Sequence, residues 1–450
     1  MNSAVLSPRN ISQYSLLGAS AVPASWIVLW ELPFWLVLSY GAIVPASTVS
    51  RQEWFGVPMK ATELCIFLSA FFYGVAAIAQ KLISGKGKGP GIVLPATLLL
   101  LTYGFLRLQM GPLETEDKLG MSFALMLAAS GPIQAAGLLY SYEKEQVRGF
   151  LNRLALFLAF VGLVYSAESI LGLGLRSEGS AMSNNDFGIE RVRGPLFGSS
   201  TGYMLLLPAI GWALQSFFDK KFKLGVAAFM TVSLLTSYLG LGSRAALILL
   251  GAYVAGLLIW LRSMKRSESP ILIAAAFCAA AGFLIFAQAD TQRLTKFEDV
   301  HRKLTHETAW TIAESEPAWM LALGQGYGSI WAWYRRDSLR GEMIAGGDNL
   351  ISTGFGASLY HAHSTLLELL VEFGLAGVLW LIVVVRQLVR LPRLAGADTP
   401  WRLFSFTLVV SLLAFGFDLF IFKEVRVNCV WWMFVMAAMR LAADKERRLA

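Results

Sequence analysis

Apolar stretches of about 20 residues recur along almost the whole chain, and they limit its possible folds more than any other feature. A membrane-spanning helix needs about 20 mostly apolar residues, since lipid offers the backbone no hydrogen-bond partners. About twelve stretches meet this requirement. They lie at 26–48, 61–80, 90–108, 119–141, 151–174, 196–218, 224–241, 245–261, 270–289, 363–385, 403–422 and 428–443. The sequence therefore predicts an all-α polytopic membrane protein.

The composition supports this class and excludes others. Only 15% of the residues are charged and 56% are hydrophobic, whereas an average soluble protein has about 25% charged residues. The net charge of +8 suits basic loops on the cytoplasmic side and does not indicate a nucleic-acid partner. Three cysteines, Cys65, Cys278 and Cys429, all lie in apolar stretches, which predicts neither a disulfide framework nor a zinc motif. The partner that these features predict is the lipid bilayer.

The breaks between the apolar stretches alternate in character. Basic residues gather in one set of breaks and in the tail after Arg440, whereas the other breaks are longer and less basic. Because lysine and arginine accumulate in cytoplasmic loops, we expect both termini in the cytoplasm and the large loop outside. This divides the chain into helices 1 to 9 (1–289), a large outer loop (290–362), and helices 10 to 12 with a cytoplasmic tail (363–450).

The large outer loop contains two patterns of its own. Apolar residues recur every three to four positions from Leu294 to Leu304, which predicts an amphipathic helix over about 291–316. This helix either lies on the membrane surface or caps the bundle. Glycines at 324, 326 and 328 then break the pattern. A glycine-rich nucleotide site needs a preceding strand and a following helix, so we expect a turn here instead.

Three polar elements fall on the same predicted face of the membrane. They are 190–200 with Arg191 and Arg193, 240–244 with Ser243 and Arg244, and 361–364 with His361 and His363. Arg244 sits in a connection so short that its charge needs a partner near the bundle. The guanidinium fork pairs well with phosphate oxygens, and histidine is suited to proton transfer near neutral pH. If the three elements converge, they predict a phosphate-bearing substrate with His363 as the proton acceptor.

These residues also have plainer structural interpretations. An arginine at the end of a span is usually an interfacial anchor, and this alternative stays open for Arg191 and Arg193. The two histidines of the predicted loop helix fit a structural role. His361 and His363 stand close enough to suggest a metal site, but no acidic or cysteine cluster accompanies them. We therefore expect neither a metal nor another cofactor.

The acidic residues after His363 cannot act on it directly if the helix is straight. Glu372 follows His363 by nine residues, which puts it on the opposite helix face and about 13.5 Å deeper. Glu368 and Glu372 are four residues apart and share a face, so packing or pairing inside the bundle is expected for them. Acidic residues within spans are candidates for function. Three others therefore remain open: Glu31, Glu168 and Asp418.

Four motifs together resemble the signature of the bacterial O-antigen ligase and O-antigen polymerase superfamily. The motif from His363 to Gly377 resembles its histidine element, and 236–246 resembles its Ser-Arg element. Residues 191–198 resemble its Arg-x-x-Gly-x-Phe-Gly element, and 324–328 its glycine-rich step before the histidine. The motifs cover about 190–380, and their order, spacing and shared face make the resemblance specific.

The chain departs from the family pattern at two places. Ser364 stands where the family usually has asparagine, and Ser199-Ser200 stands where it has Asn-Pro. The first arginine of the pattern stays ambiguous, because Arg191 has the spacing to the following glycine and Arg193 has the spacing to the phenylalanine. Neither departure removes a group that the chemistry needs.

The resemblance implies glycan transfer at the periplasmic face of the bacterial inner membrane, by an enzyme with GT-C-like membrane architecture. The donor would be a glycan on undecaprenyl diphosphate. A ligase transfers this glycan to the lipid A core, a polymerase joins repeat units, and a related enzyme glycosylates proteins. The compact loop and the single Ser-Arg element favour the ligase. A lipid-linked glycan transporter is the rival from another class, although the sequence has no internal repeat of the kind common in transporters.

The resemblance also implies roles for individual residues. Arg191 or Arg193, together with Arg244, would hold the donor diphosphate. His363, as a neutral imidazole, would take the proton of the acceptor hydroxyl, in an inverting and metal-independent reaction. The supporting residues would be His361, Ser243 and Glu372.

Overall fold

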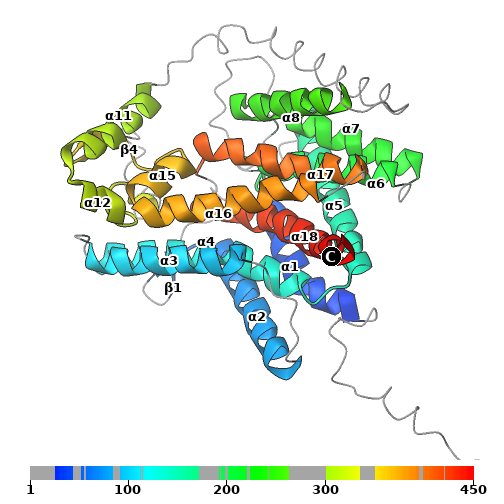
Figure 1. The fold of residues 1–450 in the computed structure, drawn as a ribbon, viewed down its shortest axis with the longest axis horizontal. Helices are drawn as coiled ribbons and strands as arrows, with labels where there is room; N and C mark the ends of the chain where they lie inside the picture. The colour runs from blue at the N-terminus through cyan, green and yellow to red at the C-terminus, as the bar shows by residue number, and fades with distance from the viewer. Residues whose placement is uncertain are drawn as a thin grey trace, which may run out of the picture.

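The structure, a computed structural model of the 450-residue chain, is a bundle of helices with two small hairpins (Figure 1). It describes residues 26–43, 52–54, 57–84, 92–111, 113, 115–171, 192, 194–197, 201–219, 223–241, 243–262, 300–334, 350–394, 399–419 and 421–449. The first half contains α1 (Ile27–Ile43), α2 (Ala61–Ser84), α3 (Val93–Met110), α4 (Thr115–Leu139), α5 (Lys144–Leu171), α6 (Tyr203–Phe218), α7 (Leu224–Gly240) and α8 (Arg244–Arg262).

The second half begins with two helices of the predicted outer loop and then returns to the bundle. Its helices are α11 (Val300–Ser315), α12 (Ala318–Leu323), α15 (Thr365–Val371), α16 (Gly374–Arg393), α17 (Thr399–Ser411), the 3₁₀ helix η6 (Leu412–Gly416) and α18 (Val425–Leu449). The strands form two antiparallel pairs, β1 (Gln52–Trp54) with β2 (Val57–Met59) and β3 (Leu350–Thr353) with β4 (Gly356–Leu359). The prediction of an all-α protein missed these hairpins, because each strand has only three or four residues.

The described helices fit a multi-pass membrane protein. Six of them, α2, α3, α4, α5, α16 and α18, contain a segment long and apolar enough to cross a membrane. Five shorter apolar segments lie in α1, α6, α7, α8 and α17–η6. The predicted ninth span, 270–289, lies outside the described residues. The count of twelve spans therefore stays a prediction.

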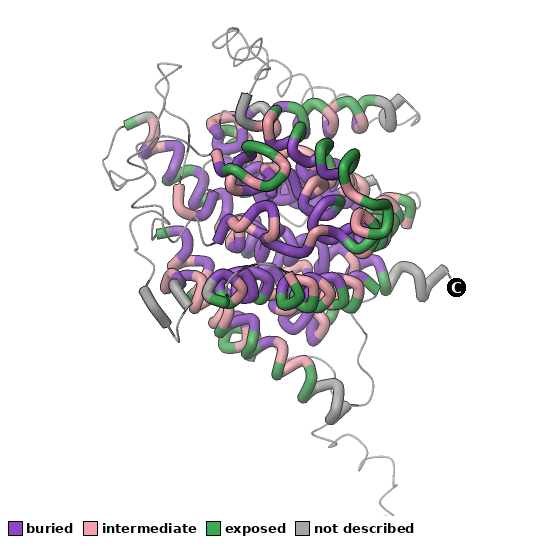
Figure 2. Tube along the Cα trace, turned by 90° about the vertical axis from the view of Figure 1, so that its left-hand side faces the viewer, coloured by how far each residue is buried: buried purple, intermediate pink, exposed green. Residues whose placement is uncertain are grey.

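Large apolar side chains cover the outside of the bundle. Phe71 of α2, Leu99 of α3 and Leu379 of α16 are 63%, 71% and 55% exposed. Figure 2 shows that exposed residues gather on the outer helices, while buried residues fill the interior. Because soluble monomers rarely expose large contiguous apolar patches, these surfaces fit contact with lipid.

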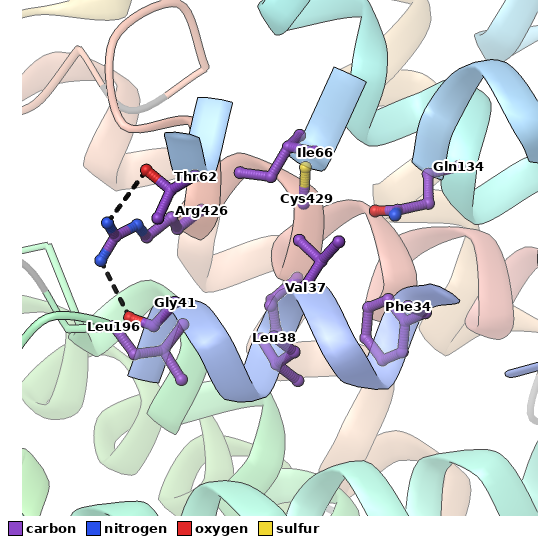
Figure 3. Close-up of a pocket in the computed structure, with 11 residues that line it drawn as sticks. Phe34, Val37, Leu38, Gly41, Thr62, Ile66, Gln134, Leu196, Arg426 and Cys429 are labelled. Carbon is purple, nitrogen blue, oxygen red and sulfur yellow. Dashed lines mark hydrogen bonds between the residues drawn. The ribbon is translucent and has the colours of Figure 1, made fainter. Parts of the chain in front are cut away.

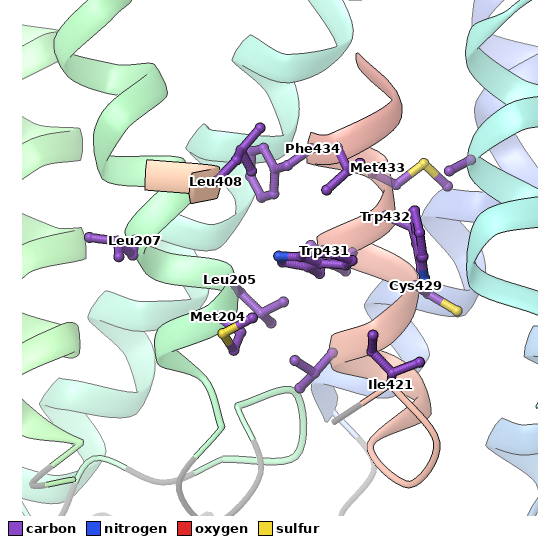
Figure 4. Packing of buried hydrophobic residues seen from close by; sticks show 14 of the residues in the cluster. Met204, Leu205, Leu207, Leu408, Ile421, Cys429, Trp431, Trp432, Met433 and Phe434 are labelled. Atoms are coloured by element: carbon purple, nitrogen blue, oxygen red, sulfur yellow. The ribbon is translucent and has the colours of Figure 1, made fainter. Parts of the chain in front are cut away.

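The C-terminal helix α18 forms the centre of the core. It packs against α4, α5 and α6. Trp431 points from α18 toward Met204 and Leu205 of α6 (Figure 4), and its indole N–H donates a hydrogen bond to Ser411 Oγ at 3.0 Å. On another side of α18, Trp432 packs where Gly131 leaves room, since a Cβ atom there would lie 2.8 Å from the indole. The core thus forms around α18, a helix distant in sequence from its partners.

One end of the bundle carries the described parts of the predicted outer loop, and we refer to it as the loop end. Helices α11, α12 and α15 lie there together (Figure 1). The β3–β4 hairpin packs on α11, where Leu359 N–H donates to Thr305 Oγ1 at 2.8 Å. The predicted loop helix over 291–316 is confirmed from residue 300 onward as α11, and 291–299 lie outside the described residues.

The predicted tenth span is not one straight helix. The short helix α15 ends at Val371, the chain turns at Glu372 and Phe373, and α16 begins at Gly374 with φ +58°. At Gly374 a Cβ atom would lie 2.5 Å from the backbone of Gly324, and a Cβ at Gly324 would lie 2.7 Å from Gly374 N. The helix is therefore broken where the end of α12 approaches it, backbone to backbone.

Candidate functional site

His363 lies in the segment that connects β4 to α15, at the loop end of the bundle. Its φ of +51° is left-handed, and it is the only residue other than glycine with positive φ among the described residues. Positive φ is uncommon outside glycine, although histidine adopts it more often than most residues; it costs on the order of 1 kcal/mol or more, and such residues cluster at functional sites. The surrounding contacts must therefore hold His363 in place.

The two residues after His363 supply these contacts. Ser364 caps α15, because its side-chain oxygen accepts the Leu367 N–H at 3.2 Å while its hydroxyl donates to Phe415 O at 3.1 Å. Thr365 donates twice to Asp418 O, from its backbone N–H at 3.2 Å and from Oγ1 at 2.8 Å. The start of α15 is thus fastened to the junction between η6 and α18.

The cap gives a physical reason for the residue type at position 364. Serine and asparagine are both preferred N-cap residues, and their replacement by alanine costs about 1 kcal/mol. We expect Ser364→Ala to lower the stability of the detergent-solubilised protein by about 1 kcal/mol, and Ser364→Asn to lower it less. Unfolding curves would test this, with the exposed Ser315→Ala as control. Equal losses for alanine and asparagine would contradict the capping role.

His361 lies directly against His363. The two ring centroids are 3.7 Å apart, and the His363 backbone N–H donates to His361 Nδ1 at 3.2 Å. The ring of Tyr360 meets His361 edge-on at 4.6 Å. Because its Nδ1 accepts a hydrogen bond, a neutral His361 carries its proton on Nε2. The part of the chain that the structure describes contains no group of three His, Cys, Asp or Glu side chains placed to hold a metal ion.

Two cations that the sequence analysis did not single out lie near His363. Burial, followed by the charges of Arg302 and Lys423, lowers the pKa of His363 from 6.5 to about 3. The imidazole is therefore neutral at pH 7, the state that accepts a proton. Arg302 belongs to α11, and Lys423 lies in the turn before α18. Lys423 could have been noticed, because a basic residue at the predicted outer end of a span departs from the positive-inside pattern.

Arg302 also acts on a buried pair beside the His363 segment. The Tyr203 hydroxyl donates a hydrogen bond to the Asp418 carboxylate, and Arg302 interacts electrostatically with both groups. Burial raises the pKa of Asp418 to about 6, although the Tyr203 hydrogen bond and Arg302 oppose the shift. Asp418, one of three acidic residues left open by the sequence, is thus next to the site.

The other two acidic residues lie elsewhere. Glu31 of α1 forms an ion pair with Arg153 and accepts hydrogen bonds from Trp35 and Tyr142. These contacts lie at the end of the bundle opposite the loop end and fit a structural role. Glu168 is buried within α5.

The structure brings the two arginine motifs into contact through their backbones. Val192 N–H donates to Gly240 O at 2.7 Å, and a Cβ atom at Gly240 would lie 2.3 Å from the Val192 side chain. Ser243 is buried and Arg244 begins α8, directly after this contact. Arg191 and Arg193 lie outside the described residues. Their segment and the α7–α8 turn therefore meet, as the predicted site requires of these two elements.

A series of contacts leads from the α7–α8 turn toward the His363 segment. Helix α7, which ends at this turn, packs against α6, and Tyr203 is the first residue of α6. Tyr203 contacts Asp418, which in turn holds Thr365. The α7–α8 turn and the His363 segment are thus connected through α6 and Asp418.

Arg426 fixes the position of the first arginine motif. Its guanidinium donates to Gly41 O at 2.9 Å, to Pro195 O at 2.7 Å and to Thr62 Oγ1 at 3.2 Å. Figure 3 shows it at one end of a small apolar pocket between α1, α2 and α18. One half-buried cation thus ties α1, α2 and the 194–197 segment to the start of α18.

Glu372 supports the glycine-rich turn. Its carboxylate accepts the backbone N–H groups of Gly328, Ile330 and Trp331 at 2.7, 2.9 and 2.9 Å. Burial raises the pKa of Glu372 to about 6 against the effect of these hydrogen bonds. The expected turn at 324–328 is confirmed, with positive φ at all three glycines.

Glu368 lies beside Glu372 and is also fully buried. Burial and the neighbouring carboxylate raise the pKa of Glu368 well above its usual range. Burial thus favours the protonated form at both carboxyl groups, and more strongly at Glu368. The expected pairing of these two residues inside the protein agrees with this arrangement.

Comparison with protein-family models and with curated proteins gives no match to this chain. The fold is that of a multi-pass helical membrane protein. The resemblance of the four motifs to a glycosyltransferase superfamily stays an expectation from the sequence.

Proposed function

We propose that the protein is a membrane glycosyltransferase that uses a lipid-diphosphate-linked glycan as donor, most similar in activity to an O-antigen ligase. One observation supports this most strongly. His363 is a neutral imidazole in a strained segment, with Arg302 and Lys423 close to it. A proton acceptor beside fixed cations suits a reaction in which a hydroxyl loses its proton and a diphosphate departs.

The proposed reaction is a single inverting displacement. The acceptor hydroxyl oxygen attacks the anomeric carbon of the donor glycan, and the bond from this carbon to the diphosphate oxygen breaks. The hydroxyl proton passes to an imidazole nitrogen of His363. The electron pair of the broken bond leaves with undecaprenyl diphosphate, so no metal is required to balance the step.

The arginines would stabilise the departing charge. We assign Arg244 and either Arg191 or Arg193 to the diphosphate, since guanidinium groups make paired hydrogen bonds to phosphate oxygens. The contact between Val192 and Gly240 supports a shared role for these motifs. Arg302 would add a further positive charge from α11.

The same proposal assigns an orientation in the bacterial inner membrane. The His363 segment would face the periplasm, and both termini would lie in the cytoplasm. Helix α16 runs from this segment to the opposite end of the bundle, where it carries Arg386, Arg390 and Arg393. Basic residues at that end fit the cytoplasmic side.

Purified protein in detergent provides the test. We expect it to transfer glycan from undecaprenyl diphosphate to rough-type lipopolysaccharide, which supplies the lipid A core, without a sealed compartment. Growth of the donor glycan on its own lipid would favour a polymerase, and glycan on a protein would favour a protein O-oligosaccharyltransferase. Movement of the lipid-linked glycan in vesicles, without any product in detergent, would favour a transporter and overturn the proposal.

A further inference from the structure

Lys423 is held in one position at the edge of the His363 site. Its ammonium nitrogen donates to Tyr360 Oη at 3.1 Å and lies 4.4 Å from the centre of the same ring. Both contacts are to Tyr360, which carries no negative charge, so within the described part of the chain they leave the Lys423 ammonium group without a carboxylate partner. Lysine side chains lose much conformational entropy when they are fixed, so an oriented lysine without a counter-charge suits an anion supplied by a ligand.

A continuous row of rings connects this ammonium group to His363. Tyr360 meets His361 edge-on at 4.6 Å, and His361 lies 3.7 Å from His363. Lys423 is also near enough to act on the charge of the His363 imidazole. A small anion bound at Lys423 would therefore lie at the other end of this short row of rings from the proton acceptor, where its charge acts on His363.

Arg302 and Lys423, the two cations that act on His363, have different partners. Arg302 interacts with Asp418 and Tyr203, whereas the contacts of Lys423 are to Tyr360. A transferase that joins two charged substrates needs separate positions for the anionic group of each. The arginine motifs and Arg302 already supply cations for the donor diphosphate, which leaves Lys423 for the acceptor.

We propose that Lys423, oriented by Tyr360, forms an acceptor subsite that binds a phosphate or carboxylate group on the acceptor sugar. The inference rests on the proposed glycosyltransferase function and assigns the chemistry of its second substrate. The ammonium group pairs with the anion, and the hydroxyl of that sugar is then presented to His363.

The subsite also gives the acceptor a part in the proton transfer. A general base works best when its pKa lies near the working pH. Before substrate binds, the positive charges of Arg302 and Lys423 lower the pKa of His363 and make it a weak base. An anion on Lys423 opposes this field and raises the pKa of His363. Two other titratable groups are close by: His361, whose ring contacts the imidazole, and Tyr360, whose ring contacts His361. The base thus gains strength when the acceptor arrives.

Two matched acceptors would test the subsite, namely rough-type lipopolysaccharide before and after removal of its core phosphates. For the phosphorylated acceptor, we expect Lys423→Met to lower kcat/KM by about 10- to 100-fold, as for the loss of one charge-assisted hydrogen bond. For the dephosphorylated acceptor, Lys423→Met should cause no loss of kcat/KM, because no anion is there to pair with Lys423 and removal of its charge also relieves the lowering of the His363 pKa. Lys423→Arg should keep the preference, and Lys303→Met, which removes an exposed charge on α11, should behave as wild type.

The outcomes separate the sources of the anion. An equal loss on both acceptors with a raised KM for the donor would assign Lys423 to the donor diphosphate and overturn the acceptor subsite. No loss on either acceptor would overturn any anion role. If wild-type protein transfers to neither acceptor, the proposed function fails, and NMR titration of labelled histidines with inorganic phosphate decides the subsite alone. Phosphate should raise the pKa of His363 in wild type and not in Lys423→Met, and the absence of this difference would overturn the subsite.

Discussion

Replacement of His363 should lower glycan transfer by about 10²–10⁴-fold, because the acceptor hydroxyl would lose its general base. Asparagine is the sharper replacement, since it tolerates the left-handed backbone at this position better than alanine does. Activity should fall through kcat, while donor binding to the arginine motifs should persist. Initial rates with purified His363→Asn and His363→Ala would measure the effect.

The control for this variant is another histidine with no place in the site. His306 lies on α11 and is exposed, so His306→Asn should keep full activity. Comparable unfolding midpoints for the two asparagine variants would exclude a folding defect as the cause. Wild-type rates from a well-folded His363→Asn protein would end the proposed mechanism.

Replacement of Glu372 should have the largest effect on stability. Glu372→Ala would leave three buried backbone N–H groups without their acceptor, those of Gly328, Ile330 and Trp331. An unsatisfied buried donor costs about 1–3 kcal/mol, so a loss of at least about 3 kcal/mol is expected unless water enters. Unfolding of the detergent-solubilised protein would measure it.

Glutamine gives a second, informative variant. One oxygen of Glu372 accepts two of the N–H groups and the other oxygen accepts the third. An amide in the same place must present its own donors to one of these positions, so Glu372→Gln should also destabilise the protein. Glu314→Gln on the exposed face of α11 is the matched control. Stability within about 0.5 kcal/mol of wild type for both Glu372 variants, the usual range of surface substitutions, would contradict the anchoring role.

Hydrophobic patterning was enough to predict most of the bundle. The stretches at 61–80, 224–241 and 245–261 became α2, α7 and α8 with small shifts at their ends. This works because lipid removes every alternative to a helix for an apolar segment that spans the membrane. The same rule does not apply at the loop end, where the β3–β4 hairpin was missed.

The broken tenth span shows where local pattern is insufficient. No residue between His363 and Arg386 strongly interrupts the apolar run, so the sequence predicts one straight helix. In such a helix Glu372 would lie on the opposite face from His363 and deeper in the membrane. The break at Glu372 depends on α12, which approaches from about 50 residues earlier in the chain. Only a tertiary contact of this kind explains why Glu372 reaches the glycine-rich turn.

The candidate site was predictable in part for a similar reason. Residue chemistry and motif spacing single out His363, the 190s segment and the α7–α8 turn, but whether these elements meet is a tertiary question that the sequence leaves open. Arg302 and Lys423 carry no motif, and each is one of many basic residues in the sequence. Their closeness to His363 arises when α11 and the turn before α18 fold against the same short segment.

The paired glycines at 324 and 374 have a mechanical consequence. The backbone at the end of α12 contacts the backbone at the start of α16 there, and no side chain lies between them that could change its rotamer. We therefore expect helix α12 and the first turn of α16 to move together as one rigid body. If the site opens to admit two bulky lipids, the hinge has to lie outside this contact, and the stretch from Tyr360 to His363 is one segment at the site that is free of helix and strand.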